Sequence, residues 1–182
     1  MPEAPPSRPP TGEVAVLVAV QSALADRPGV LTAARGLSHF GEHSIGWLVV
    51  AAVGALLMPK RSWDWLVAGA GAFAAHAAAV LVKRVVRRKR PHDPAVVVNV
   101  GTPSQLSFPS AHATSTTAAA ILMGRITGLP LPALLVPPMA LSRMLLGVHY
   151  PSDVACGIAL GATVARIAVR LEGPARKVWA NE

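Results

Sequence analysis

Long apolar runs separated by short polar or proline-containing breaks make up most of this chain. Five of them cover residues 42–58, 65–82, 111–126, 131–148 and 152–169. An α-helix needs about 20 residues to cross about 30 Å of hydrocarbon, so each run is close to the length of a span. Hydrophobic residues make up 52% of the 182 residues, too many for a soluble domain of this size. The sequence therefore predicts an all-α integral membrane bundle of about five transmembrane helices, a multi-pass protein of the cell membrane.

The segments at the two ends of the chain differ from these runs. Residues 1–12 hold five prolines and few apolar side chains, which predicts a disordered Pro-rich tail. Residues 14–25 are apolar but too short to cross a bilayer, and Asp26-Arg27-Pro28-Gly29 ends them, which favours an N-terminal interfacial helix. We expect one membrane domain over residues 13–172 and a C-terminal tail over residues 173–182.

Cationic, histidine and carboxylate side chains lie at the ends of the apolar runs. In chain order these are Lys83, Arg90, His112, Arg143, His149 and Asp153. The first two follow the second run, the third opens the third run, the next two end the fourth, and the last opens the fifth. If successive spans alternate in direction, all of these ends face one side of the membrane. We therefore expect the six side chains to form one site, and leave open which membrane face carries it and the oligomeric state.

Three of these residues and a nearby serine are suited to holding a phosphate. The guanidinium groups of Arg90 and Arg143 present planar forks of donors that match phosphate oxygens, and Lys83 supplies a point charge. Ser110 and the backbone N–H groups at the start of the third run add donors where the helix dipole favours an anion. The expected partner is therefore an anionic phosphorylated lipid in the bilayer.

Three motifs in this part of the chain resemble the signatures of the phosphatidic acid phosphatase type 2 family, which are K-x6-RP, PSGH and SR-x5-H-x3-D. They read Lys83-x6-Arg90-Pro91, Pro109-Ser110-Ala111-His112 and Ser142-Arg143-x5-His149-x3-Asp153. The first and third match with their spacings intact, and in the second Ala111 stands where the family usually has Gly. A helical φ suits Ala at the start of a span, so we expect this difference to affect only the detail of the phosphate loop. The resemblance covers about residues 38–170.

The resemblance implies a lipid phosphatase, a phosphoric monoester hydrolase that works without a metal or other cofactor. His149 is then the nucleophile that forms a phosphohistidine, and Asp153 holds its other ring N–H and fixes the tautomer. His112 protonates the leaving oxygen and later activates water. The three cations hold the charge of the transition state.

The substrate that the resemblance implies is a phosphorylated isoprenoid or glycerolipid. The short five-span form and residues 101–108 are most similar to actinobacterial members that act on decaprenylphosphoryl-5-phosphoribose in arabinan precursor and cell wall synthesis. Undecaprenyl diphosphate, phosphatidylglycerophosphate and phosphatidic acid stay open as alternatives. A non-catalytic lipid-binding protein on the same scaffold is expected to lack at least one of His112, His149 and Asp153, and all three are present.

Four other polar residues are candidate contacts for the lipid headgroup. Glu42 and His43 open the first run on the same face as the site, and Asn99 and Gln105 lie in the loop between the second and third runs. His76 lies seven residues before Lys83 and so shares its helix face. We interpret His76 as an interior histidine with satisfied hydrogen bonds, and a functional group at that depth of the bundle stays open as the alternative.

The net charge of +8 raises the alternative of a nucleic-acid partner. Six of the seventeen Lys and Arg residues lie within residues 83–90, and few aromatic side chains are available to stack on bases, so contact with anionic lipid is favoured over nucleic acid. Within this stretch we interpret Arg84, Arg87, Arg88 and Lys89 as a topology signal or lipid anchor.

A metal site is the other alternative. His149 and Asp153 are four residues apart, but Pro151 lies between them and no Cys or Glu joins them. This ligand count disfavours a metal.

Overall fold

The computed structural model describes residues 10–179, with side chains through residue 173. All the regular elements assigned in that range are helices, and one isolated β-bridge pairs Lys89 with Leu106. The all-α prediction is confirmed. Residues 1–9 of the predicted tail (residues 1–12) lie outside the described residues, and α7 (Pro151–Trp179) continues past the predicted domain boundary at residue 172.

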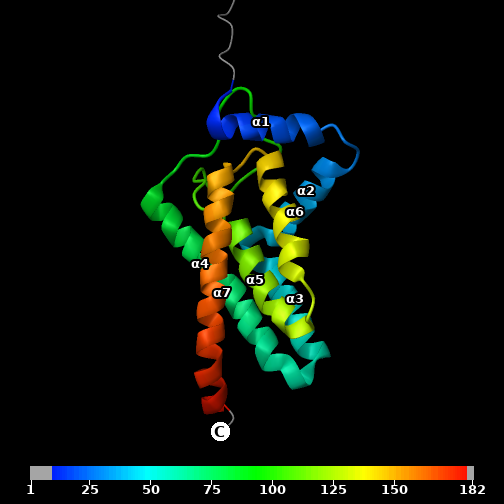
Figure 1. Cartoon of the computed structure of the whole chain (residues 1–182), viewed down its shortest axis with the longest axis vertical. Coiled ribbons are helices and arrows are strands. Elements are labelled where there is room, and N and C mark those ends of the chain that lie inside the picture. The colour runs from blue at the N-terminus through cyan, green and yellow to red at the C-terminus, as the bar shows by residue number, and fades with distance from the viewer. Residues whose placement is uncertain (1–9, 180–182) are drawn as a thin grey trace, which may run out of the picture.

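Five helices of the described chain run along the long axis of the molecule and form a bundle (Figure 1). They are α3 (Ile45–Leu57), α4 (Ser62–Val86), α5 (Ala111–Thr127), α6 (Leu131–Leu145) and α7. α5 packs against α4, α6 and α7 and is buried along most of its length. Its many Ala, Ser and Thr side chains are small enough to let neighbouring helices come close. α7 comes nearest at Gly157 and Gly161, where a Cβ would overlap the backbone carbonyl of Ser110 or Thr114.

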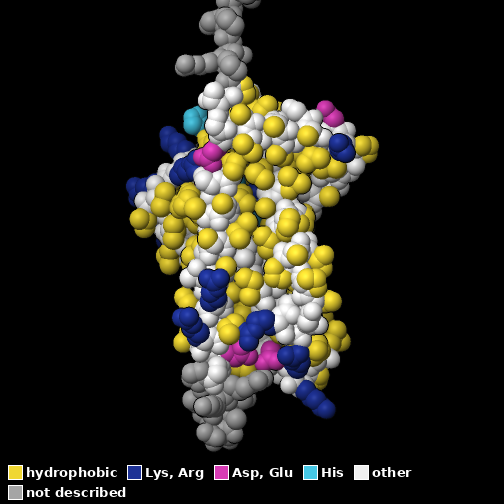
Figure 2. Space-filling model, viewed as in Figure 1, with side chains coloured by type: hydrophobic (Ala, Val, Ile, Leu, Met, Phe, Trp, Pro, Cys, Tyr) yellow, Lys and Arg dark blue, Asp and Glu magenta, His cyan; other side chains and the backbone are white. Residues whose placement is uncertain are grey.

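The bundle has the length and composition of a membrane protein. Among the described residues, three helical stretches are long and apolar enough to cross a membrane, namely residues 30–57, 59–86 and 151–173. α5 and α6 are shorter, with 17 and 15 residues. Figure 2 shows hydrophobic side chains over the sides of the bundle, with most Lys and Arg side chains toward its two ends. The prediction of a membrane helical bundle is confirmed.

The first membrane-length stretch begins at Val30 rather than at residue 42. α2 (Val30–Gly41) precedes α3 and joins it through the short 3-10 helix η1 (Glu42–Ser44). The sequence prediction missed α2 because several polar side chains interrupt its apolar pattern. The helix breaks at η1, where His43 and Ser44 have φ angles of 50° and 63°, in the left-handed region.

α1 (Gly12–Leu24) lies across the end of the bundle at which α6 ends and α7 begins (Figure 1). Gln21, with only 7% of its surface exposed, anchors it. Its side-chain amide donates to the carbonyl oxygens of Val97 (2.6 Å) and Leu145 (3.0 Å) and accepts from the N–H of Val97 (3.0 Å). Hydrogen bonds therefore hold the predicted N-terminal helix against the long loop between α4 and α5.

Candidate active site

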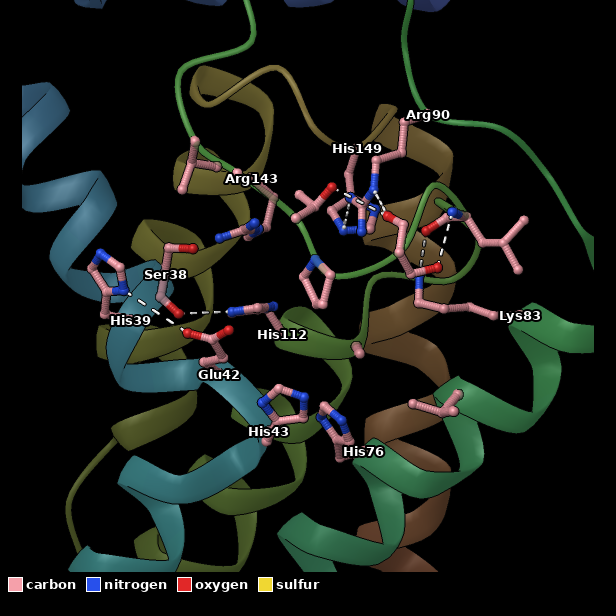
Figure 3. A pocket seen from close by; sticks show the side chains of 18 of the residues that line it. Ser38, His39, Glu42, His43, His76, Lys83, Arg90, His112, Arg143 and His149 are labelled. Carbon is pink, nitrogen blue, oxygen red and sulfur yellow. Dashed lines mark hydrogen bonds and ion pairs between the residues drawn. The ribbon is translucent and has the colours of Figure 1, made fainter.

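The structure brings most of the predicted site residues together in a cavity of about 400 Å³ (Figure 3). Its walls come from α2, η1, α4, the loop over residues 100–106, and the facing ends of α5 and α6. Lys83, Arg90, His112, Arg143 and His149 all line it. The alternation of spans predicted this convergence.

His149 lies in the turn between α6 and α7 and is almost completely buried. Its Nε2 is 3.2 Å from Nη1 of Arg90. A guanidinium only donates, so Nε2 accepts and the proton of the neutral ring is on Nδ1. Nδ1 lies 3.6 Å from Oδ2 of Asp153, which is longer than a hydrogen bond. The ring therefore has its lone pair on Nε2, and Arg90 rather than Asp153 makes the closer contact that selects this tautomer.

The charge states of this pair follow from their surroundings. Burial lowers the pKa of His149 well below its ordinary value, and the positive charges of Arg90, Arg143 and Lys83 lower it further. Burial also lowers the pKa of Arg90 to about 10, against the opposing effect of the Asp153 charge. At neutral pH the imidazole is therefore neutral and the guanidinium beside it stays charged.

Asp153 lies in the first turn of α7 and is completely buried. Its Oδ2 accepts from the backbone N–H of Tyr150 at 2.8 Å, and its Oδ1 accepts from Nη1 of Arg88 at 3.0 Å. Both oxygens of the carboxylate are thus held in place beside the ring of His149.

Arg88 connects this carboxylate to α1. Its guanidinium also donates to Oγ of Ser152 and to Oε2 of Glu13, both at 2.6 Å, and lies 4.1 Å from the ring centre of Tyr150. Oε1 of Glu13 accepts from the backbone N–H of Ser152 at 2.8 Å. Arg88 therefore makes internal contacts that a lipid anchor would not make, and its part as a topology signal stays a prediction. Sequence reasoning missed its position because α4 ends at residue 86, and helix periodicity gives no direction for a side chain beyond that point.

Arg143 lies in the last turn of α6 and is 2% exposed. Its Nε and Nη1 atoms have no hydrogen-bond partner among the described residues. A buried charge without a partner is unfavourable, and this one lines the cavity. A phosphate bound there would supply the missing acceptors, because its oxygens match the fork of guanidinium donors.

Lys83 and Arg90 also fasten the loop that forms one wall of the cavity. Nζ of Lys83 donates to the carbonyl oxygens of Ser107 (2.8 Å) and Leu106 (3.2 Å). Nε of Arg90 donates to the carbonyl oxygen of Ser104 at 2.7 Å. An ammonium has three donors and a guanidinium five, so each side chain keeps donors for a ligand.

His112 lies in the first turn of α5, across the cavity from the cations. Its Nε2 is 2.9 Å from the carbonyl oxygen of Ser38. A carbonyl only accepts, so this nitrogen carries a proton. Gly41 permits the close approach of α2, because a Cβ at that position would overlap the His112 ring.

The two residues before His112 differ in their positions. Ala111 lines the cavity in a helical conformation, as expected for Ala in place of Gly. Ser110 is buried but does not line the cavity. Its Oγ caps α5 by accepting from the backbone N–H of Ala113 at 3.4 Å.

Of the four candidate headgroup residues, the structure brings two to the cavity. Glu42 and His43 line it, whereas Asn99 and Gln105 do not. Nδ2 of Asn99 instead donates to the carbonyl oxygens of Val97 and Leu145, both at 3.4 Å. The lining also includes residues outside the four headgroup candidates: Ser38, His39, His76, Gly101, Thr102, Pro103 and Ser104. For His76 a signal was present, namely its seven-residue spacing from Lys83.

The described residues contain no group of three or more His, Cys, Asp or Glu side chains arranged to hold a metal ion. Four cationic side chains, Lys83, Arg84, Arg90 and Arg143, line the cavity, and their charge favours an anion over a metal cation. Metal independence stays a prediction.

Residues 63–177 match the sequence profile of the PAP2 superfamily. The chain is 76% identical over 160 residues to decaprenylphosphoryl-5-phosphoribose phosphatase of Mycobacterium tuberculosis (strain CDC 1551 / Oshkosh), a match that covers 88% of this chain and 90% of that protein. It is 72% identical over 148 residues to the protein of the same name from Mycolicibacterium smegmatis, which covers 81% of this chain and 82% of that protein.

Two solved structures share the fold. The PAP2-type phosphatidylglycerolphosphate phosphatase of Bacillus subtilis superposes with a TM-score of 0.68 at 20% identity, covering 87% of this chain and 85% of that chain. LpxE of Aquifex aeolicus superposes with a TM-score of 0.63 at 18% identity, covering 85% and 93%. At such identities the likeness concerns the fold alone.

Proposed function

The chain belongs to the PAP2 superfamily, and we propose that it is a metal-independent phosphatase of the cell membrane that removes the 5-phosphate of decaprenylphosphoryl-5-phosphoribose. The observation that carries the proposal is the unpartnered, buried guanidinium of Arg143 in one cavity with the lone pair of His149. Identities of 76% and 72% to phosphatases named for this substrate support the choice of lipid. The reaction serves arabinan precursor and cell wall synthesis.

In the first step, Nε2 of His149 attacks the phosphorus of the 5-phosphate. A nitrogen–phosphorus bond forms while the bond from phosphorus to O5 of the ribose breaks, and the electron pair of that bond stays on O5. Beside the bound phosphate His112 is an imidazolium; it gives O5 the proton of its Nδ1 and becomes neutral, while its Nε2–H stays on the carbonyl oxygen of Ser38. Arg90 donates to Nε2 in the free protein, so transfer of this donor to a phosphate oxygen frees the nucleophile when the substrate binds.

In the second step, water attacks the phosphohistidine. His112 takes a proton from the water, the oxygen bonds to phosphorus, and the nitrogen–phosphorus bond breaks to return its electron pair to His149. Inorganic phosphate leaves, and the dephosphorylated sugar lipid is the other product.

Charge stabilisation comes from the side chains around the reacting atoms. Lys83, Arg90 and Arg143 offset the negative charge on the equatorial oxygens of the transition state. The imidazole ring becomes positive when Nε2 is phosphorylated, and the Asp153 carboxylate, 3.6 Å from Nδ1, offsets that charge as the acid does in a Ser-His-Asp triad.

The test is phosphate release by the purified full-length protein from a panel of lipids. The panel holds decaprenylphosphoryl-5-phosphoribose, undecaprenyl diphosphate, phosphatidylglycerophosphate and phosphatidic acid at equal surface concentrations. We expect the highest kcat/KM on the ribose lipid. A preference for the plain diphosphate or for a glycerolipid would contradict the proposed substrate, and no release from any of them would favour a non-catalytic lipid-binding protein.

A further inference from the structure

The cavity has polar side chains at two separate ends. In Figure 3 the cations and His149 lie at one end, and His43 and His76 lie at the other, with His112 and Glu42 between them. The reaction described above uses the first end and His112. It gives the histidine pair no function.

The two histidines come from different elements and face each other. His43 belongs to η1 and His76 to α4, and their ring centres are 5.8 Å apart. Nδ1 of His76 is buried and has no hydrogen-bond partner within the described part of the chain. The interpretation of His76 as an interior histidine with satisfied hydrogen bonds is therefore wrong. A buried polar atom without a partner is unfavourable unless something in the cavity completes it.

The backbone at His43 is held in a conformation that non-glycine residues rarely adopt. His43 and Ser44 both have positive φ angles, of 50° and 63°. Such residues cost free energy and concentrate at functional sites. Glu42 and His43 of this break both line the cavity, so the strained segment coincides with the end of the cavity that the reaction leaves unused.

We infer that His43 and His76 bind the phosphodiester that joins the ribose to the polyprenyl chain. The inference rests on the proposed function, because it needs a substrate with a second phosphate beyond the sugar. The order of groups in the cavity matches the order of groups in that substrate. The cleaved phosphate lies among the cations, O5 lies at His112, the ribose lies beside Glu42, and the second phosphate reaches the histidine pair.

Two imidazoles suit a phosphodiester. An imidazole offers at least one N–H donor, and a phosphodiester has one negative charge and two unesterified oxygens, one for each ring. The cleaved monoester carries up to two charges and lies with the three cations. Ile45, two residues after His43, and Phe73, three residues before His76, are 57% and 54% exposed, so apolar side chains suited to the polyprenyl chain lie near the pair along the sequence.

Arg84 is the other cation in the described lining of the cavity. It follows Lys83 directly and lies about two turns of α4 beyond His76. Its place on the helix assigns it to the end that holds the cleaved phosphate. It is therefore the natural comparison for the two histidines.

The test uses two substrates that share the ribose 5-phosphate and the polyprenyl chain. A phosphodiester joins the two parts in one substrate, and an uncharged O-glycosidic bond joins them in the other. Phosphate release from both is measured with the purified full-length protein and with its His43→Ala, His76→Ala and Arg84→Ala variants. His92→Ala is the control, because His92 is exposed and lies outside the cavity lining.

Each histidine variant should lose about 10- to 100-fold in kcat/KM on the phosphodiester substrate, the loss expected for a hydrogen bond to a charged group. The kcat/KM on the substrate with the uncharged linkage should change little. Normal turnover of that substrate also shows that the variants are folded. His43→Gln and His76→Gln keep an N–H donor and should recover part of the loss.

Three outcomes would overturn the inference. Equal losses on both substrates mean that the pair is structural, unchanged kinetics mean that it does not bind the phosphodiester, and a selective loss in Arg84→Ala alone moves the subsite to Arg84. The proposed function fails separately, in the unsubstituted protein, if neither ribose substrate is hydrolysed while undecaprenyl diphosphate is.

Discussion

Arg88 donates a hydrogen bond of 3.0 Å to Oδ1 of Asp153 and holds this buried carboxylate from outside the cavity. The same guanidinium reaches Glu13 on α1. α1 lies outside residues 63–177, which match the PAP2 superfamily. An N-terminal helix therefore contributes to the position of a carboxylate that lies 3.6 Å from the ring of His149.

Arg88→Met should lower kcat more than it raises KM. The carboxylate of Asp153 loses a charged hydrogen-bond partner, which costs about 1.5–3 kcal/mol, or roughly 10- to 100-fold in kcat. Glu13→Gln should have a smaller effect, because that side chain is partly exposed and retains an oxygen to accept from α7. Steady-state kinetics measures both, with Arg87→Met as the exposed neighbouring control. An unchanged kcat in Arg88→Met would mean that the position of Asp153 does not depend on this contact.

His149→Ala should abolish turnover and leave the protein folded. The covalent route needs the Nε2 lone pair, whereas the phosphate-binding cations remain in place. Brief reaction with substrate labelled in the 5-phosphate should leave acid-labile label on the unsubstituted protein and none on the variant. His92→Ala should retain both label and turnover. A His149→Ala protein that still releases phosphate would end the proposed mechanism.

Arg143→Met should make the protein more stable and less active. Replacing a buried guanidinium that lacks partners with an apolar side chain of similar length removes a desolvation penalty, so the midpoint of thermal unfolding should rise by about 2–4 °C. Inorganic phosphate should raise that midpoint in the unsubstituted protein and not in the variant. A less stable variant that phosphate still stabilises would show that Arg143 supports the fold rather than the anion.

The low pKa of His149 should make the protein less stable in acid. The folded ring stays neutral below pH 6.5, whereas the unfolded ring takes up a proton as the pH falls through about 6.5, so unfolding becomes more favourable below that pH. Between about pH 7.5 and 5.5 the unsubstituted protein should therefore lose about 1 kcal/mol relative to His149→Gln. Unfolding temperatures followed by tryptophan fluorescence give this difference. A difference that is constant with pH would mean that the folded ring titrates normally.

The sequence predicted the site best where residues sit at helix ends. Lys83 and Arg143 each lie in the last turn of an apolar helix, and alternation of the spans is enough to bring such ends to one side. Asn99 and Gln105 share a long loop at that side, but nothing in a loop sequence determines which side chains point inward. In the structure Glu42 and His43 line the cavity, whereas Asn99 and Gln105 do not.

Long-range contacts limited the rest of the prediction. Glu13 lies 75 residues from Arg88, and no local pattern links a carboxylate on a short N-terminal helix to a guanidinium in a loop. The extent of the first membrane stretch was missed for a different reason. Hydropathy treats Ser38 as an interruption, but this serine is buried and its carbonyl oxygen accepts a hydrogen bond from His112.

Activity should survive excess EDTA, because side chains and not a metal supply the positive charge around the phosphate. Lys83, Arg90 and Arg143 line the cavity beside His149, and a divalent cation added there would be repelled by all three. Lys83→Met or Arg90→Met should therefore lower kcat by about 100- to 1,000-fold, and Mg²⁺ should not restore it. Lys89→Met, an exposed cation of the same segment, is the matched control and should keep normal turnover. The measurement is phosphate release before and after chelation, and after adding back Mg²⁺ or Zn²⁺. Loss on chelation that either metal reverses would assign the charge stabilisation to a bound ion and contradict the mechanism proposed for the three cations.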